Sequence, residues 1–81
     1  MQVRVRLGAG LARLSSAPLL NVDLAEGATI DELFARLSDD DPNLAPALRS
    51  ALPIVAGEHV SRDRRLTHRE QVALLLPVSG G

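Results

Sequence analysis

The 81-residue sequence contains no cysteine, no lysine, no tryptophan and no tyrosine, and Phe34 is its only aromatic residue. The absence of cysteine excludes disulfides, iron–sulfur clusters, thiolate zinc sites and thiol catalysis. The formal charge of −1 gives no bulk attraction to nucleic acid or anionic lipid. No apolar stretch approaches the roughly 18 residues of a membrane span. We therefore expect a soluble protein that binds neither nucleic acid nor a membrane. The lack of cysteine does not fix the compartment, and our expectation is the cytoplasm.

All nine basic residues are arginine. The simpler explanation is codon bias in a GC-rich genome, which also suits the abundance of alanine and leucine. A second explanation is functional. A carrier with an activated carboxyl end would gain from lacking internal amines that could attack it, and a protein modifier without lysine could not build chains on its own side chains.

The feature that indicates a function is the end of the chain, Val78-Ser79-Gly80-Gly81, which follows an apolar run over residues 72–76. Without side chains, the last two residues can enter a slot too narrow for any Cβ and present an unhindered carbonyl carbon. A terminal carboxyl has a pKa of about 3.3–3.7, so near neutral pH it is an anion that needs activation. The end itself is the candidate reactive group.

The alternative is a frayed terminus or an expression remnant, since chain ends tolerate small residues. The continuation of the apolar segment through Pro77 and Val78 favours a functional arm. Pro77 cannot donate to a sheet ladder and therefore marks where strand pairing ends. We divide the chain into a domain over residues 1–76 and an arm over residues 77–81, which reaches at most ~17 Å when extended.

Hydrophobic periodicity predicts one long helix and several strands. Residues 2–7 and 20–24 alternate polar with apolar side chains and are typical of half-buried strands. Residues 8–18 are predicted to be a turn-rich connection in which no helix begins, and a phosphate-binding loop there is excluded because no Lys-Ser or Lys-Thr follows the glycines. A helix is expected from Thr29, which forms a capping box with Glu32. Its core stripe is Ile30, Leu33, Phe34 and Leu37.

The second half of the chain adds short elements. Residues 43–50 are predicted to hold a short helical turn with Leu44, Leu48 and Leu52 facing inward. Residues 54–55, 58–60 and 72–76 are predicted strands, which gives an α+β domain with a helix over one face of a mixed sheet. The last strand is apolar on both sides, so Ala73 and Leu75 would lie opposite the helix. Either neighbouring loops cover them or they form a docking surface for a partner protein.

The polar residues form no catalytic constellation. His59 and His68 lack the spacing and the carboxylate partner of a helical zinc site, and no serine stands in a nucleophile-elbow motif. Asp39, Asp40 and Asp41 do not continue into the alternating ligand pattern of a hard-cation loop. We interpret them as a solvated helix end and expect no metal site.

Residues 72–81, Val-Ala-Leu-Leu-Leu-Pro-Val-Ser-Gly-Gly, closely resemble the C-terminus of the β-grasp sulfur carriers. The likeness is greatest to the small subunits of molybdopterin synthase, which commonly end in Val-Ala-Leu-Leu-Pro-Pro-Val-Ser-Gly-Gly. Residues 29–33 resemble that family's helix start, and residues 60–66 its Val-Ser-x-Asp-x-x-Leu connector. The likeness covers essentially the whole chain in element order and length. It implies an α+β, ubiquitin-like β-grasp fold, with a mixed sheet and one main helix across one face.

The resemblance also implies a chemistry in which the chain is not catalytic alone. An E1-like adenylyltransferase would use ATP and Mg²⁺ to convert the Gly81 carboxylate into an acyl adenylate. A sulfur donor such as a cysteine desulfurase or a rhodanese would then replace AMP and leave a terminal thiocarboxylate. Docked on the large subunit of molybdopterin synthase, the arm would give its sulfur to the molybdopterin precursor. No cofactor would be bound permanently. The implied site consists of the reactive Gly80 and Gly81 and the partner-binding Ala73, Leu75, Pro77, Val78 and Ser79.

The sequence departs from the family pattern at several positions. His68-Arg69-Glu70-Gln71 stands where the family has an Asp-Gly-Asp-Glu turn, and residues 54–57 lack the usual asparagine. Leu76 replaces the first of two prolines, and Gly8 takes a position that is usually bulky and apolar. These differences concern partner recognition more than the chemistry of the end.

Three other functions remain open from the sequence. The chain could carry sulfur for thiamin, cysteine or tRNA thiolation. It could be a Gly-Gly protein modifier whose carboxyl joins a target lysine. From a different class, it could be an interaction module that binds a partner through the face of Leu75 and has an inert tail.

Overall fold

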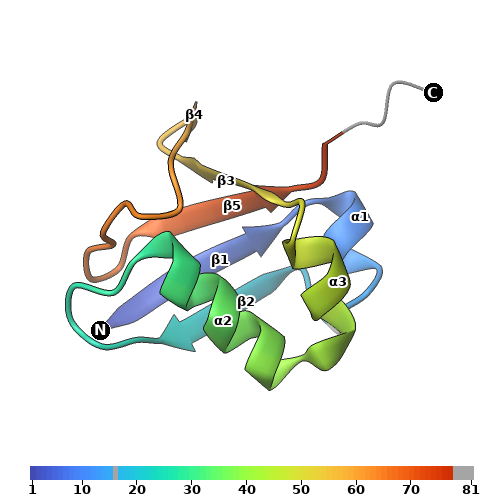
Figure 1. Ribbon diagram of the computed structural model, residues 1–81, viewed down its shortest axis with the longest axis horizontal. Helices are drawn as coiled ribbons and strands as arrows, with labels where there is room; N and C mark the ends of the chain where they lie inside the picture. The colour runs from blue at the N-terminus through green and yellow to red at the C-terminus, as the bar shows by residue number, and fades with distance from the viewer. Residues whose placement is uncertain (16, 78–81) are drawn as a thin grey trace.

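The computed structural model describes residues 1–15 and 17–77, which form a mixed sheet crossed on one face by a long helix (Figure 1). The elements in chain order are β1 (Gln2–Leu7), α1 (Ala9–Ala12), β2 (Leu19–Asp23), α2 (Ile30–Asp40), the 3₁₀ turn η1 (Pro42–Leu44), α3 (Ala45–Leu48), β3 (Leu52–Val55), β4 (Glu58–His59) and β5 (Gln71–Leu75).

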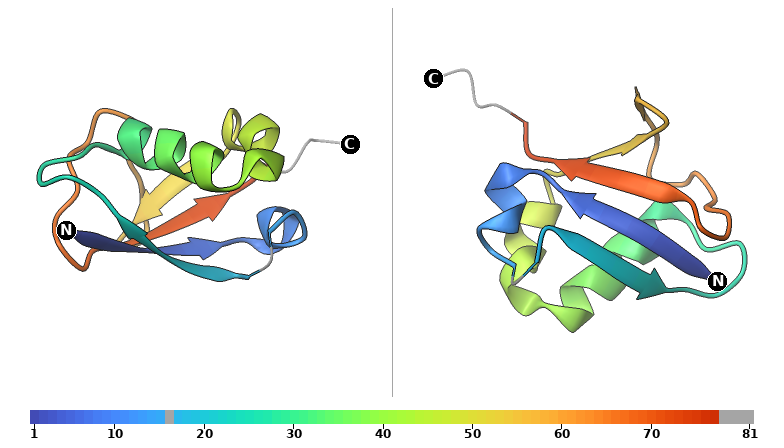
Figure 2. Two further views of the ribbon diagram at one scale, coloured as in Figure 1. Left: turned by 90° about the horizontal axis from the view of Figure 1, so that it is seen from below. Right: turned by 180° about the vertical axis from the view of Figure 1, so that it is seen from behind.

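The strand order in the sheet is β2-β1-β5-β3-β4. β1 pairs antiparallel with β2 and parallel with β5, and β5 pairs antiparallel with β3. The last strand of the chain is therefore central. Seen along the sheet, α2 and α3 lie on one side, and the view from behind shows the other face without a covering helix (Figure 2). We call this uncovered side the open face.

Alternating side chains of the central strands form the core with the helix stripe. In β1 the buried positions alternate with exposed ones along the whole strand, as the sequence predicted. Phe34 is buried as expected, and the Arg62 guanidinium lies over its ring at 4.4 Å from the centroid. The core residues of these three elements are Val3, Val5, Leu7, Ile30, Leu33, Phe34, Leu37, Val72 and Leu74.

The start of α2 confirms the predicted capping box. The Glu32 N–H donates to Thr29 Oγ1 at 3.2 Å, and the Thr29 N–H donates to Glu32 Oε1 at 3.4 Å. At the other end, the Asp41 carboxylate accepts from the Asn43 N–H at 3.2 Å and so caps η1. Part of the acidic run therefore begins the next turn of helix, which agrees with its interpretation as a helix end.

Two predictions about the connecting segments were wrong. Residues 8–18 contain a one-turn helix, α1, which forms because Leu11 is fully buried by the fold. Leu52 is not an inward-facing helical residue: it begins β3 and is half-buried, whereas Leu44 and Leu48 do face inward. Both errors have one cause, since tertiary burial decides segments too short for a periodic signal.

Candidate functional site

The described part of the predicted site is the end of β5 and the two residues that follow it. Val78, Ser79, Gly80 and Gly81 lie outside the described residues. The structure does describe Ala73, Leu75 and Pro77, so the base of the arm can be placed. β5 ends at Leu75, and Pro77 follows outside any strand, as its missing N–H requires.

The base of the arm is fixed by strands on both sides. β5 pairs over four residues with β1 and over three with β3. The Gly8 N–H donates to Leu74 O at 2.9 Å and so extends the parallel ladder one residue beyond β1. The chain thus leaves the sheet at its centre, beside α1 (Figure 1). A central strand held by two neighbours gives an arm a defined starting direction.

Two glycines of the α1 segment accommodate the leucines at the base of the arm. A Cβ on Gly8 would lie 2.9 Å from Leu75 Cδ2 and 3.2 Å from Leu74 O. A Cβ on Gly10 would lie 2.9 Å from Leu76 Cδ1. The space that a bulky side chain would need is therefore occupied by Leu75 and Leu76. Two of the departures from the family pattern, Gly8 and Leu76, lie in the same small region of the structure.

An apolar patch surrounds the base of the arm on the open face. Leu75 is directly opposite Leu52, and Ala73 is directly opposite Ile54, in the β3–β5 ladder. Directly opposite residues share a face of the sheet, so the four side chains form one group. Leu75 is 43% exposed, and the other three are half-buried. We call Leu52, Ile54, Ala73 and Leu75 the apolar patch.

Arginines flank the apolar patch. Arg6 is opposite Ala73 and Arg4 is opposite Gln71 in the β1–β5 ladder, so both lie on the open face. Arg4 also lines a cavity of about 430 Å³ together with Gln2, Asn21 and Arg69. Within residues 1–15 and 17–77, Arg4, Arg6 and Arg69 form no ion pair. A partner for this face would need apolar surface beside carboxylates.

The sequence analysis did not assign Arg4, Arg6, Leu52, Ile54 or Gly8 to the site. Alternation in residues 2–7 already placed both arginines on the face opposite the helix. That signal could have found them once the last strand was paired with the first. The contact between Gly8 and Leu75 joins residues far apart in the sequence and has no local signal.

An ion pair holds the turn that leads into β5. Arg64 donates to Glu70 through both nitrogens of its fork, at 2.8 and 3.0 Å, and the Thr67 N–H also donates to the carboxylate at 3.2 Å. The hydrogen bonds from Arg64 lower the pKa of the Glu70 carboxyl, although burial opposes them, and Glu70 in turn raises the pKa of Arg64. The next residue back, Arg69, has a positive φ of 67° where the family has glycine.

Neither a metal cluster nor a membrane helix is found in the described part of the chain. No group of three or more His, Cys, Asp or Glu side chains there could hold a metal ion. No helix of residues 1–15 and 17–77 is long and apolar enough to cross a membrane. His59 and His68 are both exposed, and His68 Nδ1 accepts a hydrogen bond from the Gln2 N–H at 3.0 Å.

A family model described as the ThiS family matches residues 9–81. The match includes the connector, β5 and the whole C-terminal arm. A comparison with curated proteins found no match. The assignment of this chain to a family by sequence therefore rests on the match to the ThiS family model.

Solved structures show the same fold at low identity. The small archaeal modifier protein 1 of Haloferax volcanii is 21% identical, with a TM-score of 0.83 over 95% of this chain and 98% of its own. A protein described as molybdopterin converting factor subunit 1, from Pyrococcus furiosus, is 21% identical, with a TM-score of 0.86 over 96% and 99%. A chain from a complex of subunits 1 and 2 of the molybdopterin-converting factor of Helicobacter pylori is 20% identical. Its TM-score is 0.71, over 100% of this chain and 100% of the matched chain. These likenesses confirm the ubiquitin-like β-grasp fold.

Proposed function

Because this chain belongs to the ThiS family, we propose that it is a sulfur carrier whose reactive group is the carboxyl end at Gly81. The observation that carries the proposal is the placement of the base of the arm. The Gly-Gly sequence follows the central strand β5, which leaves the sheet beside an apolar patch with flanking arginines. The fold fixes the base of the arm at the centre of the sheet, and the patch would give a partner a surface to dock on.

The proposed reaction takes place in sites that belong to other proteins. The Gly81 carboxylate attacks the α-phosphorus of ATP, pyrophosphate leaves, and an acyl adenylate forms. A sulfur nucleophile then adds to the acyl carbon and AMP departs. When this nucleophile is the outer sulfur of a persulfide on the donor, the product is an acyl disulfide. A second thiol then attacks the donor sulfur of that S–S bond, forms a new disulfide with it and releases the terminal thiocarboxylate. The two glycines serve this chemistry because no Cβ shields the acyl carbon.

We assign the carrier to molybdopterin synthesis as the small synthase subunit. Support comes from the printed description of the Pyrococcus protein and from the Helicobacter complex, in which a subunit 1 of this fold is bound to a subunit 2. The partners would be the large synthase subunit, an E1-like adenylyltransferase that uses ATP and Mg²⁺, and a sulfur donor such as a cysteine desulfurase or a rhodanese. Ala73, Leu75 and Pro77 would contact the first two, and Val78 and Ser79 would lead the glycines into their active sites.

The test is thiocarboxylate formation with the adenylyltransferase, ATP and a sulfur donor. Mass spectrometry should show the gain of one sulfur and the loss of one oxygen on the intact chain. Deleting Gly81, or adding one alanine after it, should abolish this change, because the acyl carbon is then displaced from the nucleotide by the length of one residue, about 3.5 Å. The control is Glu58→Gln, which alters an exposed residue of β4 and leaves the arm unchanged. Full sulfur loading of either tail variant would overturn the mechanism.

A second candidate function is protein modification, in which the Gly81 carboxyl joins a target lysine. The small archaeal modifier protein 1 shares the fold, and the absence of lysine would prevent the chain from modifying itself. The same mass measurement on protein from cells separates the two functions. A thiocarboxylate differs from the free chain by one atom, whereas a conjugate carries the mass of a second protein.

A further inference from the structure

β2 is an edge strand whose outer backbone groups are open. The Leu7 N–H donates to Pro18 O at 2.8 Å, and the Leu24 N–H donates to Met1 O at 2.9 Å, which fixes the hydrogen-bonding phase of the β1–β2 ladder. In an antiparallel pair, bonded and non-bonded positions alternate. The N–H and C=O groups of Leu20 and Val22 therefore point toward β1. Leu19, Asn21 and Asp23 turn theirs away from the sheet.

Within residues 1–15 and 17–77, the middle of this edge lacks the devices that usually prevent strand addition. Natural edge strands are protected by lysine, proline, bulges or a covering segment. The centre of β2 is Leu20-Asn21-Val22, with neither a charge nor a proline, and Leu19 is 55% exposed. Asp23 supplies a charge only at the strand's end. The backbone of β2 is thus available as a template for another strand.

A small cavity with an apolar part lies between β2 and the C-terminal end of α2. Its volume is about 200 Å³. Small-molecule pockets usually measure about 300–1,000 Å³, so this cavity suits a single aliphatic side chain. It lies on the side of β2 that faces the helix, where alternate side chains of an added strand would point. The lining residues are Leu20, Val22, Leu37 and Leu44, with Ser15, Asn21, Asp40 and Asp41 at the polar positions.

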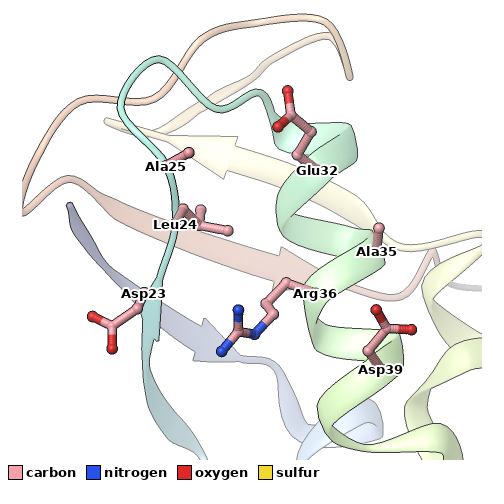
Figure 3. Close-up of a pocket in the computed structure, with 7 residues that line it drawn as sticks. All are labelled: Asp23, Leu24, Ala25, Glu32, Ala35, Arg36 and Asp39. Atoms are coloured by element: carbon pink, nitrogen blue, oxygen red, sulfur yellow. The ribbon is translucent and has the colours of Figure 1, made fainter.

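The space between β2 and α2 carries a negative rim. A second cavity, next along the same two elements, is lined by Asp23, Glu32 and Asp39, and Figure 3 shows Arg36 extending from α2 toward β2 between them. Among the described residues, Arg36 is the one basic residue lining either cavity, and it forms an ion pair with Asp40 at 3.2 Å. Five carboxylates against one guanidinium favour a cationic ligand.

We propose that the outer edge of β2 binds an extended segment of a partner protein in which an aliphatic residue is flanked by lysine or arginine. Main-chain hydrogen bonds to Leu19, Asn21 and Asp23 would give affinity, and the cavity and the acidic rim would select the side chains. β1 separates this edge from β5, so the segment and a partner on the apolar patch can bind together. The site adds an interaction that the chemistry of the arm does not require.

The test is a titration of the isotope-labelled full chain, followed by the backbone amide signals in NMR spectra. The probes are two short synthetic peptides with the same alternating Val-Ile-Val centre, one flanked by lysines and one by glutamates. The amide signals of Leu19, Asn21 and Asp23 should shift with the lysine peptide. Its affinity should exceed that of the glutamate peptide by about tenfold, the effect of a few exposed ion pairs.

Two variants separate backbone pairing from charge. Asn21→Pro removes an outward N–H without removing a hydrogen bond to β1, and it should lower the affinity for the lysine peptide by about tenfold. Asn21→Ala keeps the N–H and should bind the peptide with unchanged affinity. Asp39→Lys should lower the affinity for the lysine peptide and raise the affinity for the glutamate peptide. Equal affinity for the two peptides, shifts confined to the apolar patch, or no shift at β2 would overturn the proposal. Concentration-dependent shifts at β2 without peptide would assign the edge to a second copy and overturn it equally.

Discussion

At the residue scale, the structure turns two isolated oddities of the sequence into one arrangement. Gly8 and Leu76 both depart from the resembled family, and neither departure has a local explanation. The virtual Cβ distances show that Gly8 leaves room for Leu75 and that Gly10 leaves room for Leu76. Leu76 is half-buried against the core. The direction in which the arm leaves the fold therefore depends on two glycines about 65 residues away in the chain.

Substituting these two glycines should have different effects. Gly8 has φ −66° and ψ 167°, which any residue adopts, so Gly8→Ala tests packing alone. Its Cβ would meet a backbone oxygen, Leu74 O, and should destabilise the fold by about 1–3 kcal/mol. At Gly10 the Cβ would meet only the flexible end of Leu76, and alanine is the better helix former, so Gly10→Ala should change stability by less than about 1 kcal/mol.

Urea unfolding of the two alanine variants measures the difference. If Gly10→Ala were the more damaging substitution, the contact with Leu74 O would not control the base of the arm.

At the element scale, the sequence predicted what a periodic pattern can encode. α2 was predicted because a capping box precedes a stripe of four apolar residues, and β1 because its alternation extends over six residues. α1 was missed because four residues give no helical period and its formation depends on the burial of Leu11. Leu52 was assigned to the wrong element because a single leucine fits either pattern.

The candidate site divides in the same way. The sequence located the arm and predicted that Ala73 and Leu75 face away from the helix. The last strand is apolar at every position, so the residues between those that face the helix must lie on the opposite face of the sheet. It did not place Leu52 and Ile54 beside them, because which strand pairs with β5 is decided by topology. Arg4 and Arg6 lie beside the apolar patch because the first and last strands, β1 and β5, pair in parallel.

The connector before β5 should lose stability in acid. The pKa of the Glu70 carboxyl is lowered in the folded state, chiefly by hydrogen bonds from Arg64. This contribution is fully present above the unfolded pKa of about 4.3 and is lost as the pH falls through the lower, folded value. Glu70→Gln should cost about 1 kcal/mol at neutral pH, because the pair is partly exposed and screened.

Thermal unfolding of the Glu70→Gln variant and of the unsubstituted protein at several pH values measures this loss of stability. The difference between them should shrink as the pH falls below about 4. The exposed residue Glu58 provides the control, and Glu58→Gln should follow the unsubstituted protein throughout. A gap between the Glu70 variant and the unsubstituted protein that widened in acid would contradict the assignment.

At the scale of the whole molecule, the two faces of the sheet have different tasks. The helix-covered face contains the core, with α2 packed on alternating residues of the strands. The open face holds the apolar patch and the arginines, so substitutions there can change binding without removing core contacts. The arm leaves between these faces at the end of β5. One small domain can thus keep its stability while residues of its open face are changed, which is what the proposed docking requires.

Leu75→Glu tests this separation of tasks. Leu75 is 43% exposed, so its replacement should leave the unfolding temperature nearly unchanged. A carboxylate at the centre of the apolar patch should weaken binding to the large synthase subunit and to the adenylyltransferase by about tenfold or more, as expected for an anchor residue of an interface. Leu14, which is 44% exposed in the loop between α1 and β2, provides the matched control. Calorimetric titration should show Leu14→Glu binding like the unsubstituted chain. Equal loss of affinity in both leucine variants would mean that the apolar patch is not the docking surface.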